Sequence, residues 1–99
     1  MNLDILIKPF AELDIEEASQ WYEKKKTGLG SEFLDEIDAC LTKIVDNPRI
    51  FVEKYRDIRR ALPKRFPYAI YYIIEPYRIV VLAVIHTSMD PDYHKIRAR

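Results

Sequence analysis

The chain has 99 residues, of which 48% are hydrophobic and 32% are charged, and this combination excludes a disordered or fibrous protein. The length predicts a single domain over residues 1–99. The longest uncharged apolar run, residues 79–85, is far shorter than the roughly 20 residues of a membrane span, and the N-terminal residues lack a signal-peptide pattern. We therefore expect a cytoplasmic protein without a membrane partner.

The net charge of zero conceals a division between the two halves of the sequence. Residues 1–47 contain five lysines and eleven acidic residues, a balance of −6, whereas residues 48–99 contain eleven basic and five acidic residues, a balance of +6. Every arginine lies in the second half. This distribution predicts a dipolar molecule whose basic side can meet nucleic acid or an acidic protein. The alternative is a mixed surface whose charges happen to segregate along the chain.

The N-terminal part of the sequence predicts a short strand and then a helix. Residues 3–7 form an apolar run of the kind found in strands. Asp14, with Glu17 three residues later, has the pattern of a helix N-cap. One stripe at helical spacing follows, so we expect the first helix over residues 15–26; its members are Ile15, Ala18, Trp21, Tyr22 and Lys25.

A second helix is predicted over residues 31–46, with Ser31 as its N-cap. Its apolar residues recur at intervals of three and four: Phe33, Leu34, Ile37, Cys40, Leu41, Ile44 and Val45. We expect Leu41 in the core. The single cysteine lies in this stripe, which favours a small core residue over a redox thiol.

The second half of the chain predicts strands. Two β-branched and aromatic runs, residues 68–75 and 78–86, predict an antiparallel hairpin around Pro76. Residues 58–62 alternate and carry charge, which is typical of a strand near a sheet edge, and the preceding residues to Tyr55 are expected to be irregular. The order β-α-α-β-β-β predicts an α+β fold, with a helical hairpin on one face of a four-stranded, mostly antiparallel sheet.

The predicted central hairpin is apolar at almost every position, so both of its faces must be covered. The two helices cover one face. Because residues 92–99 form a polar, basic tail, no further helix of any length is expected for the other face. We therefore expect an open second face that binds a partner, with cover by long arginine and tyrosine side chains as the alternative.

No motif in the sequence indicates a metal or a cofactor. The two histidines, His86 and His94, are eight residues apart and lack the cysteine or acidic residues of a metal site. Phosphate-binding glycine loops and nucleophile motifs are also missing from the sequence. We expect neither a metal site nor a cofactor.

Basic and aromatic side chains gather on the predicted strands, where they could grip phosphates and stack on bases. The candidate binding residues for a partner or nucleic acid are Arg56, Arg59, Arg60, Lys64, Arg65, Tyr68, Tyr72 and Arg78. A metal-free ribonuclease needs a base, an acid and a cation for the scissile phosphate. The candidates for these roles are Arg59, Arg60, Arg65 and His86. Structural roles for the same arginines and histidine are the alternative.

The second half of the sequence resembles a known family. The segments that carry the resemblance are Arg59-Arg60, residues 66–72, residues 79–86 and Asp90-Pro91. In this order and spacing they are similar to the RelE/ParE family of bacterial toxins, which includes members labelled plasmid stabilization proteins. The predicted first strand and helical hairpin fit the same family. The resemblance implies the toxin of a type II toxin–antitoxin module, neutralised by a small antitoxin encoded by the adjacent gene.

The family implies two mechanisms for such a toxin. The RelE-like branch cuts mRNA in the ribosomal A site and generally has a basic residue after the tyrosine of the third strand and others near the end of the last strand. This sequence has Ala69 and Met89 there. The ParE-like branch inhibits DNA gyrase without obvious catalytic residues, and we expect this activity. A ribosome-dependent endoribonuclease and an inactive or repurposed binding module of the same fold are the alternatives.

Overall fold

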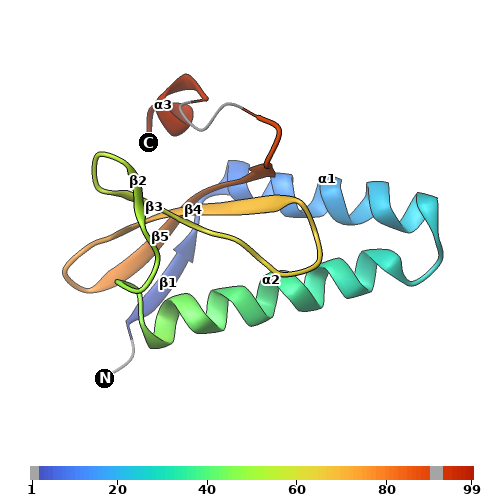
Figure 1. Cartoon of the computed structure of the whole chain (residues 1–99), viewed down its shortest axis with the longest axis horizontal. Coiled ribbons are helices and arrows are strands. Elements are labelled where there is room, and N and C mark those ends of the chain that lie inside the picture. The colour runs from blue at the N-terminus through green and yellow to red at the C-terminus, as the bar shows by residue number, and fades with distance from the viewer. Residues whose placement is uncertain (1–2, 90–92) are drawn as a thin grey trace.

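The computed structural model describes residues 3–89 and 93–99, so the Asp90-Pro91 segment lies outside the described residues. The elements are β1 (Asp4–Ile7), α1 (Pro9–Lys25), α2 (Leu29–Asp46), β2 (Glu53–Tyr55), β3 (Ile58–Ala61), β4 (Tyr68–Ile74), β5 (Arg78–His86) and α3 (His94–Ala98). Helices α1 and α2 run side by side as a hairpin (Figure 1). The expected α+β architecture is confirmed.

The sheet has five strands in the order β1-β5-β4-β3-β2, one more than the four predicted. The extra strand is β2, which pairs antiparallel with β3 within a segment that the sequence predicted to be irregular. With three residues, two of them charged, β2 is too short to show an alternating pattern. The sheet is mostly antiparallel as expected, and β1 alone runs parallel to its neighbour β5.

Helix α1 begins at Pro9, six residues before the predicted start at residue 15. Proline is favoured in the first helical turn because its missing N–H would have no partner there. The core-facing residues of α1 are spaced at four, three and four residues: Ala11, Ile15, Ala18 and Tyr22. Asp14 is therefore not an N-cap but lies within the helix. Its carboxylate accepts the Val84 N–H at 2.9 Å, where β5 extends beyond the end of β1.

Helix α2 begins at Leu29, two residues before the predicted start, and Ser31 is not its cap. Gly28 precedes the helix with a left-handed φ of 89°, and the Glu23 carboxylate accepts the N–H groups of Gly28 and Gly30 at 3.0–3.1 Å. A side chain at position 30 would place its Cβ 2.6 Å from the Ser19 carbonyl oxygen. Close packing of the two helices therefore depends on this glycine.

Strand β5 contains a bulge that determines which side chains enter each core. Tyr71 pairs with Ala83 and Tyr72 with Val81, so Leu82 has no partner on β4. The extra residue reverses the alternation beyond it. Val81 and Val84 face the helices, whereas Leu82 and Ala83 both face the opposite side.

The second face of the sheet is covered, contrary to the open face predicted from the sequence. Its buried residues include Ile58, Ala69, Tyr71, Ile73, Val80, Leu82, Ala83 and Ile85. The C-terminal segment supplies the cover, with Ile96 only 1% exposed and Tyr93 packed beside it. The alternative prediction, cover by arginine and tyrosine side chains, is met in part, by Tyr55, Tyr93 and the half-buried Arg60.

Two ion pairs hold this segment, which we call the C-terminal tail (residues 93–99). Arg97 donates two hydrogen bonds to the Asp14 carboxylate at 2.6 and 2.7 Å, and Arg99 pairs with Asp57. The backbone is left-handed at Lys95, Ile96 and Arg97, with φ of 51–54°. Because this conformation costs L-residues roughly 1–2 kcal/mol each, the burial of Ile96 and the ion pairs must offset the strain.

The packing of α2 gives a testable prediction. Ile44 is fully buried, Leu41 is half-buried against the same core, and Leu34 is 42% exposed. Ile44→Ala should lower the free energy of unfolding by about 2 to 5 kcal/mol, because it removes buried methylene groups and leaves a cavity. Leu34→Ala, the control, should cost less than about 1 kcal/mol. Urea unfolding followed by circular dichroism measures both, and equal losses would contradict this orientation of α2.

Candidate partner-binding groove

The structure separates the predicted binding residues into three regions. Four of them, Arg56, Arg59, Arg60 and Tyr72, lie on the β2–β3 side of the sheet. Another group, Lys64, Arg65, Tyr68 and His86, lies near the start of β4 and the end of β5. Arg78 lies at the opposite end of β5. The basic side chains therefore do not form one continuous site.

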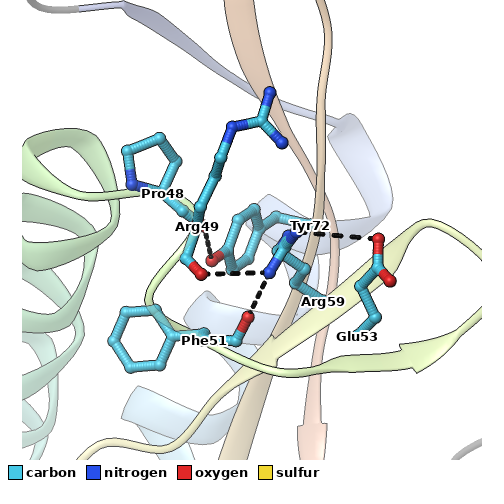
Figure 2. Close-up of polar contacts among 6 residues, drawn as sticks. All are labelled: Pro48, Arg49, Phe51, Glu53, Arg59 and Tyr72. Carbon is cyan, nitrogen blue, oxygen red and sulfur yellow. Dashed lines mark hydrogen bonds and ion pairs between the residues drawn. The ribbon is translucent and has the colours of Figure 1, made fainter.

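Arg59 stabilises the segment that connects α2 to β2 (Figure 2). Its Nη1 donates to the Phe51 carbonyl oxygen at 2.5 Å and to that of Arg49 at 3.2 Å, and its Nη2 lies 3.6 Å from Glu53. The side chain is only 14% exposed. Through the β3–β4–β5 register, Arg59 is level with Val81, which is five residues or about 16 Å along the strand from His86.

Tyr72 holds the same connecting segment from the core side, as Figure 2 also shows. Its ring is fully buried, and its hydroxyl donates to the Pro48 carbonyl oxygen at 2.6 Å. Burial raises the pKa of Tyr72 to about 12, although the nearby Arg59 guanidinium opposes the shift. The structure therefore gives Tyr72 an internal role, with no surface offered to a partner.

The other two residues on this side of the sheet are more accessible. Arg60 is half-buried opposite Tyr71 on the second face, and its guanidinium makes no hydrogen bond or ion pair within the described residues. Arg56 is exposed in the tight β2–β3 turn with a φ of 53°, and its Nε donates to the Tyr55 hydroxyl at 3.3 Å.

The remaining arginines pair with acidic residues. Arg65 Nη2 lies 2.6 Å from Glu32 on α2, and its guanidinium lies over the Phe66 ring. The backbone N–H groups of Lys64 and Arg65 both donate to Glu36. Arg78 Nε donates to Glu75 at 2.8 Å. These contacts tie the β3–β4 connection to α2 and close the β4–β5 turn.

Tyr68 and His86 lie opposite each other in the β4–β5 register, with ring centroids 5.3 Å apart. His86 Nδ1 accepts the Ser88 N–H at 3.0 Å, which leaves Nε2 as the protonated nitrogen of the neutral ring. Tyr68 is half-buried against Tyr22 and Phe33, and burial raises its pKa. Both side chains border a groove.

This groove has a volume of about 620 Å³ and lies between α1 and the ends of β4 and β5. Its lining residues are Asp14, Glu17, Ala18, Trp21, Tyr22, Pro67, Tyr68, Val84, Ile85, His86 and Met89. We call it the α1 groove. Trp21 is 52% exposed and Met89 is 38% exposed, so large apolar surfaces face solvent here.

The charge of the α1 groove is acidic. Asp14 and Glu17 contribute carboxylates, and no lysine or arginine is among the lining residues in the described part of the chain. Asp14 already pairs with Arg97, whereas Glu17 makes no hydrogen bond or ion pair within the same part. Residues 3–89 and 93–99 also contain no group of three or more potential metal ligands. Such a groove suits apolar or aromatic side chains accompanied by a basic group.

Sequence reasoning missed the role of Trp21 because it assigned Trp21 and Tyr22 to one core stripe. Neighbouring helical residues point about 100° apart, so one of two adjacent large aromatics commonly lies at the border of the buried stripe. In the structure Tyr22 packs against Phe33 and Phe66, whereas Trp21 faces outward. The adjacent aromatic pair was therefore the available signal for an exposed aromatic site.

The fold is similar to that of a solved structure described as a chromosomal ParDE TA system from P. aeruginosa. The match has a TM-score of 0.65 and covers 85% of this chain and 95% of the other, at 10% sequence identity. No curated protein sequence matches this chain. At this identity the structural match shows a shared fold.

Sequence comparison identifies the family. The family model described as "ParE toxin of type II toxin-antitoxin system, parDE" matches residues 5–91. The chain belongs to the ParE toxin family, and the predicted assignment to type II toxins is confirmed. No helix in the described ranges is long and apolar enough to cross a membrane.

The buried Tyr72 hydroxyl gives a prediction about pH. Its pKa is about 12 in the folded protein against 10 for the ordinary group, so the unfolded chain releases this proton first. The contribution to stability is therefore complete below pH 10 and decreases as the pH rises toward 12, by roughly 2 kcal/mol. Tyr72→Phe should lack this decrease and cost about 1 kcal/mol at pH 7 through the lost hydrogen bond to Pro48.

Urea unfolding between pH 7 and 11.5 measures both effects. Tyr77→Phe, at a side chain that is 86% exposed, controls for the loss of a tyrosine hydroxyl. Parallel stability curves for the wild type and Tyr72→Phe across this pH range would contradict the assignment.

Proposed function

We propose that the α1 groove binds the antitoxin of this toxin, and that the free toxin inhibits DNA gyrase without cutting RNA. The observation that carries the proposal is the groove lining, which combines exposed aromatic and apolar side chains with carboxylates and lacks a cation among the described residues. This composition favours a protein segment over a phosphate chain.

Ala69 and Met89 support the proposal, because a RelE-like nuclease is expected to have basic residues at these two positions. Ala69 is fully buried in the second core, where a long cationic side chain would displace packed neighbours. Met89 borders the groove and is apolar. RNA cleavage without a metal requires a cation to stabilise the transition state, and losing one such donor commonly costs about a hundredfold to a thousandfold in rate.

The remaining candidates offer little replacement for these cations. Arg59 is held by backbone carbonyls and lies about 16 Å along the sheet from His86. Arg65 is nearer to the groove but pairs with Glu32. His86 and Tyr68 are the one specific feature that favours the alternative nuclease, because they could move a proton at the groove.

Partner binding by the α1 groove is testable with the product of the adjacent gene. Trp21→Ala should weaken binding about thirtyfold, because exposed aromatic side chains in interface pockets commonly contribute 2 kcal/mol or more. Tyr77→Ala is the control, since Tyr77 is 86% exposed at the β4–β5 turn, away from the groove. Calorimetry with each variant measures the affinities. Equal losses for the two variants, or none for Trp21→Ala, would place the antitoxin elsewhere.

The target is testable by two assays run with the same protein. Purified toxin should inhibit supercoiling by gyrase, and primer extension on mRNA from expressing cells should show no codon-positioned cuts. Cuts that vanish in Arg65→Ala or His86→Ala would instead identify a ribosome-dependent endoribonuclease. Inactivity in both assays, with antitoxin binding intact, would favour the repurposed binding module.

A further inference from the structure

The outer edge of β1 has no pairing strand in the described part of the chain. β1 is the terminal strand of the sheet and pairs with β5 on its inner side. The Lys8 N–H donates to the Val81 carbonyl oxygen at 3.0 Å, and alternate residues of a strand direct their main-chain groups to opposite edges. Ile5 and Ile7 therefore direct their N–H and C=O groups outward.

This edge is short and mostly apolar, with Asp4 at its start and Lys8 and Pro9 directly after it. Ile5 is 37% exposed and Leu6 is 41% exposed. Proteins commonly protect open edges with charges, prolines or bulges. Within β1 the only charged residue is Asp4, at the start of the strand, and the pairing with β5 is regular.

A second hollow adjoins this edge on the helical side of the sheet. It has a volume of about 360 Å³ and lies between α1 and α2, with Ile7, Ile15 and Leu34 as its apolar lining. Glu12 and Glu16 add carboxylates to the lining, and neither carboxylate makes a hydrogen bond or ion pair within residues 3–89 and 93–99. Because Ile7 belongs both to the hollow and to the strand, the two features form one continuous surface.

We propose that this surface binds an extended segment of a partner protein, which adds to β1 as a sixth strand and directs basic side chains toward Glu12 and Glu16. The outward groups of Ile5 and Ile7 supply the main-chain hydrogen bonds, as in other cases of strand addition. On the helical side, a lysine or arginine places its apolar stem against Ile7 and its charge beside the carboxylates.

The charge beside β1 favours a basic partner segment over a second copy of this chain as the molecule that binds this edge. Two copies paired through β1 about a two-fold axis perpendicular to the sheet would keep both helical hairpins on one side. Glu12 and Glu16 of each copy would then approach those of the other, and like charges in such proximity are destabilising. A basic segment is complementary to the same carboxylates. The β1 surface is separate from the α1 groove, and binding there does not depend on the identity of the toxin's target.

The probe is a seven-residue peptide of alternating lysine and valine, acetylated at its N-terminus and amidated at its C-terminus. Titration into the isotopically labelled full chain should shift the amide resonances of β1, and the outward amides of Ile5 and Ile7 should gain protection from hydrogen exchange. A matched peptide with glutamate in place of lysine should bind at least tenfold more weakly. Absence of β1 shifts at millimolar peptide, or equal binding of both peptides, would overturn the proposal.

Ile5→Pro tests the main-chain contact. Proline removes the outward N–H and leaves the inner hydrogen bonds to β5, so binding of the lysine peptide should fall about fivefold to tenfold, whereas Ile5→Val should retain it. Circular dichroism checks that Ile5→Pro folds. If it does not fold, a lysine peptide methylated on alternate backbone nitrogens replaces it, and undiminished binding of that peptide would contradict strand addition.

The charge contact and the second copy are tested separately. The double substitution Glu12→Gln, Glu16→Gln should weaken the lysine peptide about tenfold, whereas Asp35→Asn, at an exposed position of α2, should not. Equal losses for these variants would overturn the charge argument. Sedimentation of the wild type should show no dimer, and a dimer lost in Ile5→Pro would assign the edge to a second copy and overturn the proposal.

Discussion

The burial of β5 on both faces is the constraint on which the rest of the structure depends. Residues 79–85 are all buried, so the helices must cover one side and the C-terminal tail the other. The bulge at Leu82 then assigns Val84 to the helical core and Ala83 to the second core. One inserted residue therefore brings the end of β5 into the position from which it borders the α1 groove.

Asp14 connects the parts of the molecule that this strand separates. From within α1, its carboxylate accepts the Val84 N–H at 2.9 Å and pairs with Arg97 at 2.6 Å. It also borders the α1 groove. The Asp14 carboxylate therefore contacts the end of β5 and the C-terminal tail, and it also lines the α1 groove.

The sequence was sufficient for the features that depend on local pattern. Helical spacing predicted the α2 stripe, and aromatic and β-branched runs predicted β4 and β5. The bulge could not be predicted, because a run that is apolar at every position does not show which residue faces which side. Tyr68 and His86 were predicted and border the groove. The internal role of Arg59 depends on carbonyl groups eight and ten residues away, which no strand pattern contains.

The left-handed winding of the C-terminal tail should make this segment move between a closed and an open state as one unit. The end of a right-handed helix frays one residue at a time, because each residue still prefers the right-handed conformation. Lys95, Ile96 and Arg97 are left-handed, so they lack this preference for the conformation that they adopt. Once Ile96 leaves the second core, the turn relaxes as a unit. Closing it again requires Ile96 and Arg97 to be placed together against the conformational preference of the backbone. The tail should therefore open and close cooperatively, as one unit.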